Sequence, residues 1–329
     1  MAMGFLNVYK ERGMTSHDVI NRLRKISGIK QIGHGGTLDP MAEGVMAVAI
    51  GKATRLLQFL NDDKTYLAQI RLGQTTVTDD VEGKTLTQTD DVSHITRAEV
   101  ERVLATFVGK QQQIPPIYSA IKKGGVKMYE LARKGEAPEE LEARSVEMYK
   151  VELLSFELPH LSVRVACSKG TYIRSLARDL GQILGVGGCL SGLLREQSGP
   201  FQVTQSKRLD EVKDAGRENF ANFLLPIQNA LEIETVELQR DFAKRLANGQ
   251  VLNRQQAMTG IMSDAPEPTQ QVASAQNTCR EENIGSEHLS LSSKELYLAV
   301  HEGTTVALVR LKEGNLLQPE VVLVNATEI

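Results

Sequence analysis

The 329-residue sequence predicts an α+β protein with a mixed sheet, followed by a small all-β unit. Up to about residue 228, short apolar strand patterns alternate with amphipathic helical patterns, and some strands are expected to be joined by hairpins. Residues 295–324 contain only short strand patterns with turns at Gly303 and Gly314. The length is sufficient for two domains, which we place at residues 1–229 and 230–329.

Local signals define the elements of the first half. The helix at residues 14–28 has Thr15 and Asp18 at capping-box spacing, and Gly28 ends it. The helix at residues 96–109 has the same spacing at Thr96 and Glu99. Strands are expected at residues 4–10, at 44–51, which is apolar and bounded by glycine, and at 64–76, which alternates.

Two later segments, residues 115–143 and 263–293, interrupt this regular pattern, and residues 161–185 between them follow it. Residues 115–143 begin with two prolines and contain a Gly124-Gly125 break, so they read as a long excursion with one short helix. Residues 161–185 predict a strand, a tight turn at Ser168–Gly170 and a helix. Residues 263–293 are polar and have no periodicity, which predicts a disordered insertion in the C-terminal domain.

Composition narrows the function classes. The net charge of −3 gives no global excess for binding nucleic acid, although it leaves room for a local basic face. The three cysteines form no CxxC pair, which favours reduced structural thiols. The sequence shows neither the apolar run of a signal peptide nor a membrane span, so we expect a cytoplasmic protein.

The stretch GHGGTLDPMAEGV, residues 33–45, surrounds Asp39 with glycines. One interpretation is a phosphate loop, but GxxxxGK[ST] and GxGxxG are missing and a carboxylate would repel phosphate. Another is a metal site, but His34 and Asp39 have no third ligand nearby. A structural turn is the plainest alternative. The fourth is a site where backbone approaches a flat ligand closely, because glycine has no Cβ, with one carboxylate aimed at it.

This stretch resembles the catalytic motif of the TruB-type family, the bacterial tRNA pseudouridine synthases that act on the T-loop uridine at position 55. Further segments resemble the family's other motifs in the same order, over about residues 5–205. They are KTYLAQIRLG, PPIYSAIKKGGVKMYELARKGE, CSKGTYIRSLARDLG and LLREQSGPF. The matching residues of the first motif are Gly33, His34, Gly36, Thr37, Leu38, Asp39, Pro40 and Gly44.

The resemblance implies a pseudouridine synthase fold, with a mixed, largely antiparallel central sheet and flanking helices. It also implies a PUA-like β-barrel at residues 230–329 and an RNA-gripping insertion at 115–143. The expected partner is the T-arm of tRNA, with no membrane, no metal and no cofactor, and the protein is expected to be a monomer.

The same resemblance assigns the site residues. Asp39 is the essential carboxylate, and Arg174 pairs with it and keeps it ionised. Without the resemblance, Arg174 would be read as a solvated residue at a helix start. The other expected contacts are Tyr66 on the flipped base, Tyr172 and Leu193 in the pocket wall, His34 on RNA near that base, and Lys122, Lys123, Lys127 and Arg133 on RNA phosphates.

Two departures and two rival functions remain. Glu43 stands where the family usually has a small or hydroxyl residue, and LLREQSG carries one basic residue where relatives often carry more.

Asp39 could attack as a nucleophile or remove a sugar proton, and the sequence does not decide between these roles. The rivals are a non-catalytic RNA-binding or tRNA-folding chaperone and a phosphate-binding metabolic enzyme, for which Lys52 is the only lysine near the loop.

Overall fold

The structure, a computed structural model, describes residues 2–119, 121–128, 131–132, 135–136, 141–259 and 295–329. The chain divides into two compact units, Met1–Leu231 and Glu232–Ile329, and each is described by itself. The segment 263–293 and Arg133, for which the sequence predicted disorder and a phosphate contact, lie outside the described residues.

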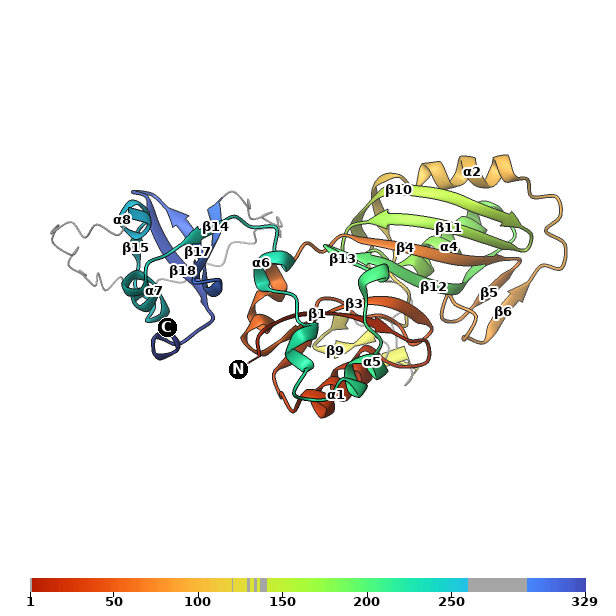
Figure 1. Ribbon diagram of the computed structural model, residues 1–329. Helices are drawn as coiled ribbons and strands as arrows, with labels where there is room; N and C mark the ends of the chain where they lie inside the picture. The colour runs from red at the N-terminus through yellow and green to blue at the C-terminus, as the bar shows by residue number, and fades with distance from the viewer. Residues whose placement is uncertain (1, 120, 129–130, 133–134, 137–140, 260–294) are drawn as a thin grey trace. The chain divides into compact units, whose positions relative to one another are not determined.

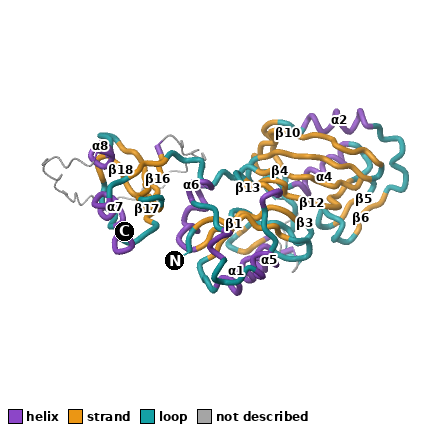
Figure 2. The backbone as a smooth tube through the Cα atoms, in the orientation of Figure 1, coloured by secondary structure: helices purple, strands orange, loops and turns teal. Residues whose placement is uncertain are grey.

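A nine-stranded sheet forms the centre of the first unit, as the continuous layer of strands in Figure 2 shows. Every pair of neighbouring strands is antiparallel except β3 and β12, which are parallel. The predicted mixed, largely antiparallel sheet is therefore confirmed. Its order is β1 (Gly4–Lys10), β3 (Ala42–Ile50), β12 (Gly188–Ser198), β4 (Lys64–Leu72), β11 (His160–Cys167), β10 (Arg144–Glu157) and β7 (Gly109–Gln113), with β2 (Ile32–His34) beside β3 and β13 (Phe201–Gln202) beside β12.

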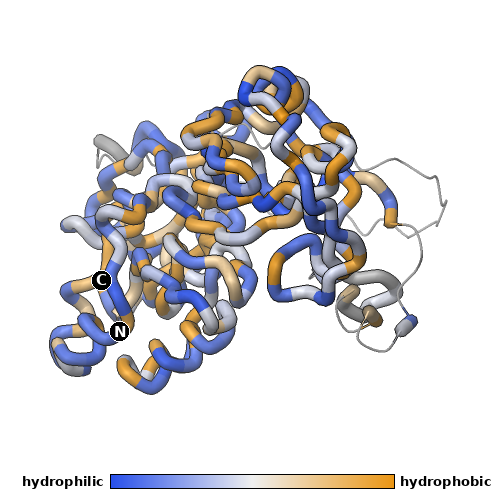
Figure 3. Tube along the Cα trace, turned by 90° about the vertical axis from the view of Figure 1, so that its right-hand side faces the viewer, coloured by the Kyte–Doolittle hydropathy of each residue, from blue (hydrophilic) through white to orange (hydrophobic). Residues whose placement is uncertain are grey.

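Helices cover this sheet in two groups (Figure 1). Helices α1 (Ser16–Ser27) and α5 (Leu209–Asp214) pack on β1 and β3 over one apolar cluster. Helices α2 (Arg97–Thr106) and α4 (Ile173–Ile183) share a second cluster with β4, β10 and β11. Hydrophobic and hydrophilic residues are interspersed along the chain (Figure 3), and in β4 buried positions alternate with more exposed ones, so one side of that strand is buried.

The predicted helix starts are confirmed. The Thr15 hydroxyl accepts a hydrogen bond from the backbone N–H of Asp18, and the Asp18 carboxylate accepts one from the backbone N–H of Thr15. Thr96 and Glu99 form the same reciprocal box at the start of α2. Each box satisfies backbone N–H groups that the first helical turn would otherwise leave unpaired.

The strand predicted at residues 64–76 is wrong in its extent. It ends at Leu72, because Gly73 takes a φ of 81° that bends the chain away. The next residues form β5 (Gln74–Thr76), which pairs with β6 (Thr85–Gln88) in a separate two-stranded sheet.

The excursion contains a small hairpin that the sequence reading missed. Strand β8 (Lys122–Lys123) pairs with β9 (Val126–Lys127), so the backbones of Lys122 and Lys127 lie opposite each other. Gly124 and Gly125 form its turn with φ angles of 59° and 85°. A Gly-Gly pair between two strands is a recognised hairpin signal.

The second unit contains a five-stranded sheet in the order β14 (Thr235–Glu237), β16 (Leu296–His301), β17 (Thr304–Lys312), β18 (Leu316–Val322) and β15 (Leu252–Asn253). The segment from β16 to β18 contains only strands, with turns at Gly303 and Gly314, as predicted, and the α-helices in the described part of the unit, α7 (Arg240–Ala247) and α8 (Arg254–Thr259), lie before that segment. Phe242 and Leu246 give α7 a buried side. Within the described residues, no helix is long and apolar enough to cross a membrane.

Short elements complete the two units. Those of the first unit are η1 (Gly51–Phe59), η2 (Val203–Gln205), η3 (Phe220–Phe223) and α6 (Ile227–Ala230). Those of the second unit are β14 (Thr235–Glu237), α7 (Arg240–Ala247), β15 (Leu252–Asn253), α8 (Arg254–Thr259), β16 (Leu296–His301), β17 (Thr304–Lys312), β18 (Leu316–Val322) and η5 (Ala326–Glu328).

Candidate active site

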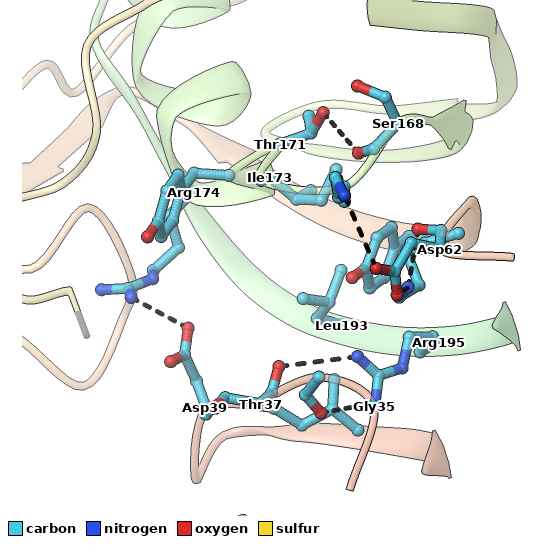
Figure 4. A pocket seen from close by; sticks show the side chains of 17 residues that line it. Gly35, Thr37, Asp39, Asp62, Ser168, Thr171, Ile173, Arg174, Leu193 and Arg195 are labelled. Carbon is cyan, nitrogen blue, oxygen red and sulfur yellow. Dashed lines mark hydrogen bonds and ion pairs between the residues drawn. The ribbon is translucent and has the colours of Figure 1, made fainter. Parts of the chain in front are cut away.

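A pocket of about 320 Å³ opens beside the one parallel strand pair of the sheet. The loop before β3, the start of β4, the turn between β11 and α4, the first turn of α4 and the middle of β12 form its walls (Figure 4). Its volume lies at the lower end of the range of ligand pockets, roughly 300–1,000 Å³. Segments from distant parts of the sequence therefore meet at one small site.

Asp39 lies in the loop that joins β2 to β3. The loop is fixed at both ends, since the backbone N–H of Gly35 donates to the carbonyl of Ala47 at 2.9 Å and the N–H of Leu38 donates to the Ser16 hydroxyl at 2.8 Å. The Asp39 side chain keeps 39% of its surface exposed. A mostly backbone-held loop thus presents one accessible carboxylate to the pocket.

Arg174 reaches that carboxylate from the first turn of α4. Its Nη2 lies 2.9 Å from Oδ2 of Asp39, and the two side chains point toward each other in Figure 4. The guanidinium is 5% exposed and lies 3.7 Å from the buried carboxylate of Asp80. It also donates to the carbonyls of Thr78 and Tyr118 at 3.1 and 2.9 Å. These partners hold the guanidinium in one position.

Arg195, on β12, binds backbone carbonyls. This side chain is 1% exposed, and it donates from Nε to the carbonyl of Val45 at 2.6 Å and from Nη2 to that of Gly36 at 3.3 Å. Gly44 pairs with Arg195 across the parallel strands and has a φ of 103°. A Cβ there would collide with the Arg195 carbonyl oxygen, so this glycine is required for the strands to meet.

Lys10 supports the same loop from the end of β1. It is fully buried, and its Nζ donates to the carbonyls of Ala42 at 2.6 Å and Glu11 at 3.1 Å. Burial lowers the pKa of Lys10 to about 8, although the nearby Asp39 charge opposes that shift. The sequence reading missed Lys10 and Arg195, because their acceptors are carbonyls from another part of the chain.

The three other predicted pocket residues line the same cavity as Asp39 and Arg174. Tyr66 lies on β4 opposite Arg195, and burial raises the pKa of its phenol. Tyr172 is the N-cap of α4, where its backbone N–H and carbonyl both bond to the side chain of Gln113. Leu193 contributes an apolar side chain from β12 (Figure 4). Together they give the pocket an apolar and aromatic wall.

His34 and Glu43 lie outside the pocket lining. The Nδ1 atom of His34 accepts a hydrogen bond from the backbone N–H of Gly36 at 3.3 Å, and burial lowers the pKa of the imidazole. The carboxylate of Glu43 accepts a hydrogen bond from the Tyr9 hydroxyl. The structure therefore does not bring either side chain to the cavity. The hairpin holds Lys122, Lys123 and Lys127.

Charge in the pocket lining favours an anionic ligand. The lining contains four cationic side chains, from Lys64, Lys169, Arg174 and Arg195, against two carboxylates. Asp62, the second acid, lies 3.1 Å from Lys64 and 4.0 Å from Lys169 at one edge of the cavity. A positive excess in a concave site raises the local concentration of negatively charged substrates.

The donor set suits carboxylate chemistry on a flat ring. In the part of the chain that the structure describes, no three or more His, Cys, Asp or Glu residues form a group that could hold a metal ion. Asp39 combines exposure with a fixed cationic partner, as an ionised nucleophile or general base requires. The aromatic wall can stack on a planar group beside it.

Comparisons with known proteins agree in sequence and fold. A model described as TruB family pseudouridylate synthase (N terminal domain) matches residues 24–173, and one described as tRNA pseudouridylate synthase B C-terminal domain matches residues 174–232. The tRNA pseudouridine synthase B of Gloeothece citriformis (strain PCC 7424) is 43% identical over 75% of this chain and 81% of that protein. The protein of the same name from Clostridium tetani (strain Massachusetts / E88) is 43% identical over 75% and 84%.

Among solved structures, one titled "Crystal Structure of a Cbf5-Nop10-Gar1 Complex" matches with a TM-score of 0.67. The match covers 99% of this chain and 86% of that chain at 24% sequence identity. At that identity, the likeness supports the fold alone.

Proposed function

Because this chain belongs to the TruB family of pseudouridylate synthases, we propose that it isomerises uridine to pseudouridine in tRNA, at position 55 of the T-loop. The observation that carries this proposal is the ion pair between the exposed carboxylate of Asp39 and the buried guanidinium of Arg174 inside a small pocket. The reaction breaks the N-glycosidic bond, turns the uracil and rejoins it through carbon. It needs a carboxylate and a closed space, and no redox step or phosphate donor.

Asp39 is the residue that acts on the substrate in this proposal. It either attacks the ribose or base as a nucleophile, or removes a sugar proton as a general base. Both routes use the carboxylate, and Arg174 holds a positive charge 2.9 Å from it. The target uridine must first leave its stack, and Tyr66, Tyr172 and Leu193 receive the flipped base. His34 contacts RNA outside the cavity, near the flipped base.

We assign RNA-gripping to residues 115–143 and a PUA-like role to the second unit, in a cytoplasmic monomer that needs no cofactor or metal. Replacing Lys122, Lys123 and Lys127 together by glutamine should weaken T-arm binding and flatten its salt dependence, by about one unit of slope per lost phosphate contact. Arg133 is assigned to the same surface. An unchanged slope would remove this hairpin from the RNA interface.

The proposed activity is tested with an unmodified T-arm transcript. We expect the purified protein to convert the uridine at position 55, with pseudouridine mapped at single-nucleotide resolution after carbodiimide treatment and reverse transcription. A transcript with cytidine at that position is the matched control and should stay unmodified. Tight binding without any pseudouridine would contradict the proposal and favour the non-catalytic chaperone instead.

A further inference from the structure

An exposed aromatic side chain that the proposed chemistry does not use contacts a residue between two that line the pocket. Tyr149 lies in β10, where Met148 pairs with Cys167 and Lys150 pairs with the adjacent Ala166. Tyr149 is therefore the extra residue of a β-bulge, a feature that changes the direction of a side chain relative to a regular strand. The residue remains 47% exposed.

Contacts on two sides place Tyr149 beside the pocket wall. Its hydroxyl donates to Oδ1 of Asp63 at 2.9 Å, and the residues before and after Asp63 both line the pocket. Two residues before Tyr149, the carbonyl of Glu147 accepts from the backbone N–H of Ser168 at 2.8 Å, and the N–H of Glu147 donates to the Ser168 hydroxyl at 2.9 Å. Ser168 belongs to the pocket lining. The ring thus stands at the junction of two wall segments.

This arrangement suits stacking on a nucleobase. The hydroxyl bond restricts the ring before any ligand arrives, so little side-chain entropy is lost on stacking. Bases of any kind stack on exposed aromatic rings in single-stranded RNA. Lys169 belongs to the pocket lining, is 70% exposed and lies 4.0 Å from the carboxylate of Asp62. Its charge is available to a phosphate of the same RNA segment.

We propose that Tyr149 is a stacking platform for a nucleobase next to the uridine that enters the pocket. The inference rests on the proposed function. When the target nucleotide flips out, its neighbour loses a stacking partner, and this loss is part of the cost of flipping. A fixed aromatic ring beside the cavity replaces the lost contact and keeps the neighbouring nucleotide in place.

The test uses the full-length protein, single-turnover kinetics and two variants. Tyr149→Leu removes the aromatic ring, and we expect the half-saturating T-arm RNA concentration to rise by roughly 10-fold, a typical loss for one stacked base. Tyr149→Phe keeps the ring and loses the bond to Asp63, and we expect it to stay within about twofold of the wild type. Equal losses in both variants would make the tyrosine a hydroxyl strut and overturn the proposal.

Abasic RNA identifies the stacked base. One T-arm RNA lacks the base 5′ of the target uridine, and a second lacks the base 3′ of it. The loss caused by Tyr149→Leu should disappear on one of these RNAs and persist on the other. A loss that persists on both would overturn the proposal. If the wild type forms no pseudouridine on intact RNA, the proposed function fails. If it does and Tyr149→Leu binds normally, only the platform fails.

Discussion

Two walls of the pocket each contain a buried arginine, and the two differ in what they bind. Arg174, from α4, is 5% exposed and lies against the carboxylates of Asp39 and Asp80, in addition to its two carbonyl acceptors. Arg195, from β12, is 1% exposed and donates to backbone carbonyls of the Asp39 loop and of β3. An arginine therefore pairs with carboxylates on one wall, and on the other wall an arginine fixes the path of the backbone.

The difference follows from the acceptors. A guanidinium in contact with carboxylates stabilises their charge, and each partner depends on the other for burial. A guanidinium that spans neutral carbonyls fixes the path of the chain through several donors in one plane. We therefore attribute the charge pairing of Asp39 to the α4 wall and the path of its loop to the β12 wall.

The largest effect on the single-turnover rate is expected at Asp39. Asp39→Asn keeps the size of the side chain and removes its charge, and an amide is a poor nucleophile and a poor base. The single-turnover rate should fall by about 10⁴-fold, the upper end for a positioned acid–base group. RNA affinity should change little, because most of it comes from phosphate contacts elsewhere. A normal rate per bound RNA would mean that Asp39 is a structural residue.

Arg174→Met removes the positive charge that pairs with Asp39. We expect the single-turnover rate to fall by about 10²–10³-fold, the scale for losing one fixed electrostatic partner. The matched control is Arg178→Met, one turn later on α4, because Arg178 pairs with Asp79 at 3.0 Å and does not line the pocket. If Arg174→Met and Arg178→Met lose similar stability and have similar single-turnover rates, the effect of Arg174 is structural.

Arg195→Met removes the hydrogen bonds from Arg195 to the carbonyls of the Asp39 loop and of β3. A displacement of the Asp39 loop by about 1 Å would lower the rate by roughly 10²-fold without a matching change in RNA affinity. Arg195→Lys should recover part of the rate, since an ammonium reaches only some of the carbonyls that a planar guanidinium spans. Circular dichroism of both variants checks that the fold persists. A wild-type rate in Arg195→Met would remove the positioning role.

Lys10 sharpens the comparison, because it is another buried cation that binds carbonyls of the Asp39 region. Burial lowers the pKa of Lys10 from 10.5 to about 8, while Asp39, Glu43 and Glu82 oppose the shift and Arg195 adds to it. Above pH 8 the folded state loses this proton while the unfolded state keeps it until about pH 10.5, so the contribution to stability rises with pH in that window.

The measurement is urea unfolding of wild type and Lys10→Met at pH 7, 8, 9 and 10. Wild type should gain about 1.4 kcal/mol per pH unit over the variant above pH 8 and nothing below it. Parallel curves throughout would show that Lys10 keeps its ordinary pKa. Taking the difference between the two proteins removes the contribution of every other titrating group that they share.

The sequence predicted elements whose signals are local. The capping box of Thr15 and Asp18 lies within four consecutive residues, and it marks the start of α1 correctly. Helix α7 also had a local signal, with Phe242 and Leu246 on one side and Gly249 just beyond its end, and it was missed. The hairpin at Gly124-Gly125 was missed in the same way, because its strands are only two residues long.

The site depended on contacts between distant segments. Asp39 and Arg174 were paired only through the family resemblance, because no spacing rule links a loop to a helix far along the chain. Arg195 was missed, although it alternates with Leu193 on the same strand and so faces the same side. Asp80 was missed because an acidic turn reads as solvated until a buried arginine is placed against it.

The most direct test of the division between charge and shape is a pair of double-mutant cycles on the free energy of unfolding. One cycle combines Asp39→Asn with Arg174→Met, and the other combines Asp39→Asn with Arg195→Met. We predict a coupling energy of about 0.5–3 kcal/mol in the first cycle, as for residues in direct contact, and additivity within about 0.5 kcal/mol in the second. Equal coupling in both cycles, or a larger coupling to Arg195, would contradict the account.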